Sequence, residues 1–243
     1  MGLVLLLGHR GAPHATAPEN TLAAIERALR QGADGVEVDV RVTADDVPVL
    51  HHDPTLVRSA QDTRDLSSVP YAELPWIESH RIPRMSEVID LVRCRGTLVL
   101  ELKGPSWPVT SGSDPVEAIV RVLRRHRLEG VTVSSFDRLR LRALRTAGLS
   151  VRTALLGRPV APAFGVLTQA LHDGHDEVHL HLSSFLLRPE VVSAAQDVGK
   201  TVVVWTVNRQ SDLRFCLDGG AHAVITDDPS ASRAGLPARR ATA

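Results

Sequence analysis

The 243-residue sequence lacks a long apolar run and an excess of charge of either sign. No run reaches the roughly 18 apolar residues that a membrane-spanning helix needs. The apolar start Gly2–Gly8 is too short, and has no basic flank, to be a signal peptide. We therefore expect no stable membrane insertion. The 28 basic residues balance the 28 acidic ones, so the composition indicates no polyanion-binding surface and no nucleic acid as a partner.

Cysteine and lysine are also scarce. The two cysteines, Cys94 and Cys216, lie far apart without the spacing of metal ligands, so we expect reduced core residues in a cytoplasmic protein. The only two lysines are Lys103 and Lys200, so the other 26 of the 28 basic residues are arginines. A lysine at a particular position of this chain is therefore informative.

What the sequence does contain is an alternation of strand and helix patterns from end to end. The length, with 43% hydrophobic residues, suits one large core. About eight strands that alternate with helices predict an α/β fold of the TIM (β/α)8 type with a parallel sheet. A doubly wound open sheet is the alternative, but no glycine-rich phosphate fingerprint supports it. The expected strands are Leu3–Gly8, Gly35–Val42 with an extension Val47–His51, Thr97–Leu102, Val131–Ser134, Val151–Leu155, Glu177–Leu182, Thr201–Val207 and Ala223–Thr226.

Helices are expected between these strands, over Leu22–Gln31, Met85–Val92, Asp114–His126, Asp137–Ala147, Ala161–His172, Pro189–Val198 and Ser211–Leu217. Residues 54–83 show little periodicity and read as a short insertion after strand two, with one helical turn near Tyr71–Leu74. We interpret residues 1–229 as one barrel domain. The composition of residues 230–243 predicts a disordered tail.

The strand Gly35–Val42 carries the most informative pattern. Alternation places Val36, Val38 and Val40 on one face and the carboxylates of Glu37 and Asp39 on the other. Two neighbouring buried carboxylates repel each other unless they are paired or bind a metal, and a divalent cation held by oxygens removes that cost. A strand with one solvated polar face is the alternative interpretation.

Catalytic residues of (β/α)8 barrels lie where the strands end. His9 and Arg10 follow the first expected strand, and Glu101 and Lys103 end the third. Phe136, Trp205 and Asp227 occupy comparable places on later strands, and His52 lies on the extension of strand two. A polar site at this end of the barrel is therefore expected.

These residues lie within motifs that resemble the glycerophosphodiester phosphodiesterase family. The motifs cover essentially residues 3–229, in the family's order. They are Gly8–Gly11, Ala17–Thr21, Gly32–Asp39, His52–Leu56, Leu100–Lys103, Ser135–Asp137, Val204–Asn208 and Ile225–Asp227. The resemblance implies the same barrel, with hydrolysis of glycerophosphodiesters to glycerol 3-phosphate and an alcohol. Two departures from the family pattern concern the leaving group. The segment Thr226–Pro229 has an acid where a basic or aromatic residue is often found, and the stretch 57–68 lacks the usual threonine- and glycine-containing pattern.

The resemblance also implies roles for individual residues. Glu37, Asp39 and Glu101 would bind a divalent metal, which we expect to be Mg²⁺ or Ca²⁺ because all the ligands are carboxylates. His9 and His52 would be the acid–base pair. Arg10 and Lys103 would hold the phosphate, while Phe136 and Trp205 would form an apolar wall around the glycerol or the leaving group.

Several interpretations stay open at this point. His51 competes with His52, and the family pattern favours His52 and leaves His51 a structural neighbour. Asp53 is expected to hold a turn, and His179 and His181 to have hydrogen-bonded structural roles. The alternatives are the same chemistry on another phosphodiester, such as a lysophospholipid or glycerophosphoinositol, and a non-catalytic phosphoester-binding barrel. The sequence leaves the alcohol, the metal and the oligomeric state undetermined.

Overall fold

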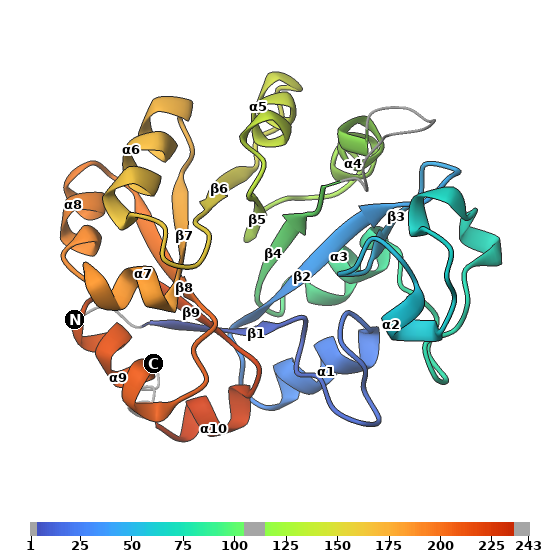
Figure 1. The fold of residues 1–243 in the computed structure, drawn as a ribbon, viewed down its shortest axis with the longest axis horizontal. Helices are drawn as coiled ribbons and strands as arrows, with labels where there is room; N and C mark the ends of the chain where they lie inside the picture. Colours follow the sequence, from blue (N-terminus) through green and yellow to red (C-terminus); the bar gives the residue numbers. More distant parts are fainter. Residues whose placement is uncertain (1–3, 105–114, 236–243) are drawn as a thin grey trace.

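Eight parallel strands close into a barrel in the computed structural model, which describes residues 4–104 and 115–235 (Figure 1). The barrel closes because β1 pairs with both β9 and β2. This closure confirms the TIM-type prediction, and the open-sheet alternative is wrong. The barrel strands are β1 (Leu5–His9), β2 (Gly35–Val42), β4 (Thr97–Leu102), β5 (Val131–Ser135), β6 (Arg152–Leu156), β7 (Glu177–His181), β8 (Thr201–Trp205) and β9 (Ala223–Thr226).

Helices surround the strands (Figure 1). They are α1 (Leu22–Arg30), α3 (Met85–Val92), α4 (Pro115–Leu123), α5 (Arg138–Thr146), α6 (Ala163–Asp173), α7 (Leu182–Leu187), α8 (Val191–Asp197), α9 (Gln210–Asp218) and α10 (Pro229–Ala234). Among the described residues, no helix is both long and apolar enough to cross a membrane. The expected cap at Asp114 lies outside the described residues, and α4 ends at Leu123, earlier than predicted.

Alternation along the strands divides the apolar residues between two layers. Val36, Val38 and Val40 belong to the large cluster that packs strands against helices. Leu7 and Val203 belong to a smaller cluster with Val99, Ala223 and Ile225. The valine face of β2 is therefore buried against helices, as predicted, and its carboxylate face points into the barrel.

The extension of strand two is a separate short strand, β3 (Pro48–Leu50), which pairs antiparallel with β2. The insertion that follows it contains the short helix α2 (Val57–Ala60) and two single turns, η1 (Leu66–Ser68) and η2 (Tyr71–Glu73). The predicted turn near Tyr71 is confirmed, whereas α2 and η1 were not expected. The insertion has its own apolar cluster, composed of Val49, Leu56, Leu66, Val69, Tyr71, Ile77 and Ile82. This cluster fixes the insertion beside the end of β2.

Two predictions about local structure are wrong. Residues 230–234 are helical rather than disordered, because Asp228 caps α10 and Arg233 binds Asp34 (Nη2–Oδ2 2.7 Å) and the carbonyl of Gly32. Residues 236–243 lie outside the described part of the chain. The predicted strand Glu177–Leu182 ends at His181, whose side chain caps the unpredicted helix α7.

Candidate active site

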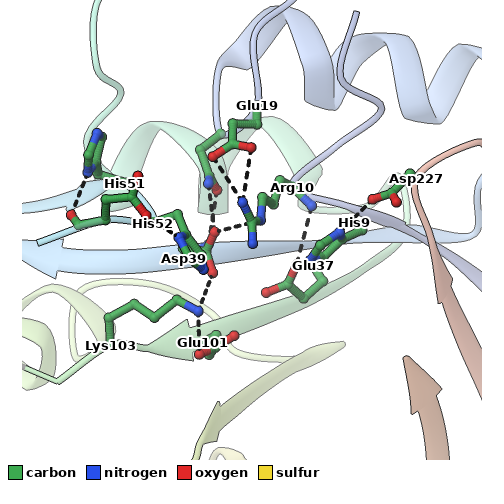
Figure 2. A network of polar contacts seen from close by, with 12 residues as sticks. His9, Arg10, Glu19, Glu37, Asp39, His51, His52, Glu101, Lys103 and Asp227 are labelled. Atoms are coloured by element: carbon green, nitrogen blue, oxygen red, sulfur yellow. Dashed lines mark hydrogen bonds and ion pairs between the residues drawn. The ribbon is translucent and has the colours of Figure 1, made fainter. Parts of the chain in front are cut away.

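Three carboxylates from two neighbouring strands meet at one end of the barrel (Figure 2). Glu37 and Asp39 lie on β2, and the parallel register places Asp39 beside Glu101 of β4. One oxygen of each carboxylate lies within 4.8 Å of the other two, and all three residues are buried. Because these oxygens converge in a site that excludes most water, their number and type suit a hard divalent cation.

The neighbouring basic residues compensate the negative charge of Asp39 more than that of Glu37. Burial and the charge of Asp39 raise the pKa of Glu37 to about 8. Burial has the same effect on Asp39, but Lys103 and Arg10 outweigh it and lower the pKa of Asp39 to about 2. Within the described residues, Glu37 Oε1 is buried without a hydrogen-bond partner. A carboxylate oxygen without a partner that faces two other carboxylates fits a cation-binding site.

Lys103 lies between two of these carboxylates. Its Nζ is 2.9 Å from Asp39 Oδ1 and 2.6 Å from Glu101 Oε1. Burial alone lowers the pKa of Lys103, but these two carboxylates raise it overall. The ammonium therefore stays charged and offsets part of the negative charge of the cluster.

A tight turn after β1 brings Arg10 to the same carboxylates. Arg10 has a φ of 54°, in the left-handed region, and its backbone N–H donates to Glu37 Oε2 at 3.2 Å. Its side chain lies 3.2 Å from Asp39 Oδ2 and donates to Glu19 at 3.0 Å. Asn20 donates to Asp39 Oδ2 (2.7 Å) and accepts from the Asp39 N–H (3.0 Å). The backbone strain at Arg10 thus accompanies a convergence of polar groups.

His9 is held by a carboxylate that directly follows β9, the last strand of the barrel. Its Nδ1 donates to Asp227 Oδ1 at 2.6 Å, and its Nε2 lies 3.9 Å from Glu37 Oε2. Burial lowers the pKa of His9, but the bond to Asp227 and the charge of Glu37 raise it overall. Asn208 fixes Asp227 in turn, through Nδ2 and Oδ2 at 2.6 Å. The imidazole is therefore oriented with Nε2 toward the carboxylates.

His52 shows the same arrangement, because its Nδ1 donates to Asp53 Oδ1 at 2.6 Å. The side chain of Asp53 thus orients His52, and does more than hold the predicted turn. The neighbouring His51 is buried, with Nδ1 2.7 Å from the Asp53 carbonyl and Nε2 2.8 Å from Ser59 Oγ. Both nitrogens of His51 are engaged, which fits its expected structural role.

The insertion connects the two sides of the site through Arg58, on α2. Arg58 Nε donates to Asp53, the carboxylate that holds His52. Its Nη2 donates to Glu19 Oε1 at 2.5 Å, and Glu19 also accepts from Arg10. Burial raises the pKa of Asp53, but Arg58 and His52 outweigh it and lower that pKa to about 2. The carboxylate therefore stays ionised against His52.

The two predicted wall residues meet beside the site. The rings of Phe136 and Trp205 make an edge contact at 5.7 Å, and His181 contacts Trp205 at 4.9 Å. His181 also accepts from Ser183 N (3.1 Å), and His179 hydrogen-bonds to Glu177 (2.9 Å) inside the barrel. The structural roles expected for His179 and His181 match these contacts.

Sequence reasoning did not assign four residues that the structure brings to the site: Glu19, Asn20, Arg58 and Asp227. Asp227 was noted as a strand-end residue and as part of the matching segment Ile225–Asp227, which was a usable signal. Asn20 and Glu19 precede Thr21, the residue that caps α1 through Ala24 N (3.2 Å), so a capping sequence concealed their contacts. Nothing local marks Arg58 as part of the site, because its partner Glu19 is 39 positions away and the role of its nearer partner Asp53 depends on His52.

Comparisons with known proteins agree with this geometry. A profile of the Glycerophosphoryl diester phosphodiesterase family matches residues 9–231. The chain is 29% identical over 239 residues to a glycerophosphodiester phosphodiesterase of Caldanaerobacter subterraneus subsp. tengcongensis, which covers 93% of this chain and 94% of that protein.

Solved structures show the same barrel. The fold is similar to that of a glycerophosphodiester phosphodiesterase from Thermotoga maritima, with a TM-score of 0.79, 24% identity and coverage of 95% and 97% of the two chains. A phosphodiesterase of Oleispira antarctica, solved with its product sn-glycerol-3-phosphate, is similar with a TM-score of 0.81 and 27% identity, covering 96% of each chain. The chain therefore belongs to the glycerophosphoryl diester phosphodiesterase family and is a phosphoric diester hydrolase.

Proposed function

We propose that this enzyme hydrolyses glycerophosphodiesters to glycerol 3-phosphate and an alcohol, with a divalent cation as cofactor and with His9 and His52 as the acid–base pair. One observation carries the proposal. Two imidazoles, each held at Nδ1 by an aspartate, lie at the same end of the barrel as three buried carboxylates. The product seen with the Oleispira antarctica phosphodiesterase supports glycerol 3-phosphate as the product here.

Glu37, Asp39 and Glu101 would hold the cation, because their oxygens converge and Glu37 Oε1 has no other described partner. We propose Mg²⁺ or Ca²⁺, since oxygen ligands favour hard cations. When bound, such an ion supplies Lewis-acid polarisation and charge compensation at a phosphoryl oxygen.

The protein's own residues account for the rest of the reaction. Arg10 and Lys103 neutralise the diester anion through charge-assisted hydrogen bonds. One histidine removes the proton of the attacking hydroxyl, which belongs to water or to the glycerol moiety, and the other protonates the departing alkoxide. Attack by a glycerol hydroxyl gives a cyclic phosphodiester, which water then opens to glycerol 3-phosphate. The aspartates at both Nδ1 atoms keep each Nε2 available for these transfers.

The other sequence-based interpretations also remain proposals here. The family match over residues 9–231 supports a single domain over residues 1–229. The core position expected for the cysteines holds for Cys216, which is buried, but is wrong for Cys94, which is exposed. Both are free thiols, which supports the proposal of a reducing cytoplasm as the compartment. Phe136 and Trp205 are proposed to line the place of the glycerol or the leaving group.

A hydrolysis assay on a panel of diesters tests this function. The panel contains glycerophosphoglycerol, glycerophosphocholine, glycerophosphoinositol and a lysophospholipid, each with and without EDTA. The assay measures released glycerol 3-phosphate for the first three and released lysophosphatidic acid for the lysophospholipid. We expect hydrolysis of glycerophosphodiesters that stops with EDTA and returns with Mg²⁺ or Ca²⁺. Full activity after chelation would refute the metal requirement, and turnover of the lysophospholipid alone would favour the alternative substrate. A folded protein that binds these esters without turnover would favour the non-catalytic barrel.

Replacing Lys103 by arginine tests whether the proposed phosphate site has room for a larger basic group. Lys103 contacts both Asp39 and Glu101 and is only 13% exposed at its side chain. A guanidinium is broader than an ammonium, so it would displace one of these carboxylates even though the charge is kept. We expect Lys103→Arg to lower kcat/KM by roughly tenfold or more.

Lys200→Arg is the matched control, because it exchanges the chain's only other lysine, which lies outside the site. Its kinetics should equal those of the wild type. A Lys103→Arg enzyme with wild-type kcat and KM would show that the site has room for the larger group.

A further inference from the structure

A pocket of about 670 Å³ adjoins the proposed catalytic groups. His52, Glu101 and Lys103 line it together with Phe136. The remaining lining includes the first turns of α5. It also includes Arg158, which lies between β6 and α6. The pocket therefore extends from the proposed site of bond cleavage to a part of the barrel that the proposed chemistry does not use.

Basic side chains dominate this pocket. Five basic and two acidic residues line it. Three of the basic groups already face carboxylates. Arg138 and Arg142 bind Asp173 at 2.6 and 2.5 Å, and Lys103 binds Asp39 and Glu101. A fourth, Arg41, donates to the carbonyls of His52 (2.9 Å) and Gly104 (2.7 Å).

Arg158 differs from these groups. Its guanidinium lies over the ring of Phe136, with its central carbon 5.2 Å from the ring centroid. It is exposed, and it forms no ion pair with a carboxylate of residues 4–104 or 115–235. Stacking on an aromatic ring orients a guanidinium without using its N–H donors. Among the residues that the structure describes, the guanidinium of Arg158 has no hydrogen-bond partner either, so it presents its donors and a positive charge to the pocket.

We propose that this pocket receives the leaving alcohol and that Arg158 selects diesters whose alcohol carries a second anionic group, a phosphomonoester or a carboxylate. This inference rests on the proposed function for the position of the scissile phosphate. An anion in the pocket gains charge-assisted hydrogen bonds from an otherwise unpaired guanidinium.

The same contact disfavours a quaternary ammonium alcohol such as choline. Recognition of a quaternary ammonium uses the open face of an aromatic ring. In this pocket Arg158 covers the Phe136 ring, and its positive charge repels a second cation. A neutral alcohol experiences neither the attraction nor the repulsion, so the kcat/KM of its diester should lie between those of the anionic and the choline diesters.

Four diesters of glycerol 3-phosphate test the proposal, with glycerol, glycerate, phosphoglycerol and choline as leaving alcohols. We expect wild-type kcat/KM to be highest for the two anionic alcohols and lowest for choline. Arg158→Gln should lower the ratio of anionic to choline kcat/KM by roughly threefold to tenfold, the size of one exposed charge contact. Arg158→Glu should lower that ratio further. The glycerate and phosphoglycerol diesters show whether a carboxylate suffices.

Arg188→Gln is the matched control, since Arg188 also stacks on a phenylalanine (Phe164, 4.9 Å) but does not line this pocket. Its ratio of anionic to choline kcat/KM should equal that of the wild type. Equal ratios in wild type and Arg158→Gln would overturn the proposal. If the wild type hydrolyses none of the diesters, the proposed function fails. The Kd values of the same diesters for wild type and Arg158→Gln then decide whether Arg158 selects anions.

Discussion

Replacing Glu37 by glutamine is expected to remove most of the hydrolytic activity while the protein stays folded. Glutamine has nearly the same volume as glutamate but no negative charge, so the cluster of Glu37, Asp39 and Glu101 loses the oxygen anion that lacks another described partner. Loss of a bound cation removes several kcal/mol of transition-state stabilisation, so we expect kcat to fall by roughly 10³-fold. Calorimetric titration with Mg²⁺ and Ca²⁺ should show a parallel loss of affinity.

The stability of the metal-free protein separates this effect from misfolding. Burial and the charge of Asp39 already oppose ionisation of Glu37, so a neutral amide at this position costs little. We expect a thermal midpoint for metal-free Glu37→Gln equal to or above that of the metal-free wild type. Glu26→Gln, which breaks the surface pair with Arg95 (2.6 Å), should leave both kcat and metal affinity unchanged. A Glu37→Gln enzyme with wild-type metal affinity would show that the cation binds elsewhere.

The second large effect is expected at the histidines. His52→Ala and His9→Ala should each lower kcat by roughly 10²- to 10⁴-fold, because each removes one proton-transfer group. His51→Ala is the matched neighbour. Both of its ring nitrogens bind within the protein, so its loss should reduce stability by roughly 1–3 kcal/mol and kcat by much less. A His51 variant as impaired as the His52 variant would contradict this assignment.

A diester with p-nitrophenol as the leaving group separates the acid from the base. This alcohol leaves as an anion without protonation, so the variant that lacks the general acid should recover most of its rate on this substrate. The variant that lacks the general base should stay slow on both substrates. If both variants remain equally impaired, neither His9 nor His52 protonates the leaving alkoxide.

The sequence by itself determined which strands form the barrel and which face of β2 carries the carboxylates. A strand has a period of two, so the valines at 36, 38 and 40 had to be buried on one side and Glu37 and Asp39 placed on the other. The family motifs at His9, His52 and Glu101 are local for the same reason: His9 and Glu101 lie at the ends of β1 and β4, and His52 follows β3 by two residues. Short-range periodicity and motif spacing suffice for such features.

Local pattern was insufficient where a side chain depends on a distant partner. The composition of residues 230–243 predicted disorder, yet α10 is anchored because Arg233 reaches Asp34, 199 positions away in sequence. The predicted strand through Leu182 ends early because His181 becomes a helix cap. In both cases polar contacts of specific side chains outweigh the local composition.

Only the tertiary structure decided how the catalytic groups are held. The carboxylates that orient the two histidines differ in their sequence separation from them. Asp53 is adjacent to His52, whereas Asp227 is 218 positions from His9. The contact between Arg58 and Glu19 spans 39 positions, and the stacking of Arg158 on Phe136 joins two different barrel connections. Closure of the barrel places the ends of all eight strands at one rim, so residues from every part of the chain meet there. A sequence shows the order of these residues, and the closed sheet determines their distances.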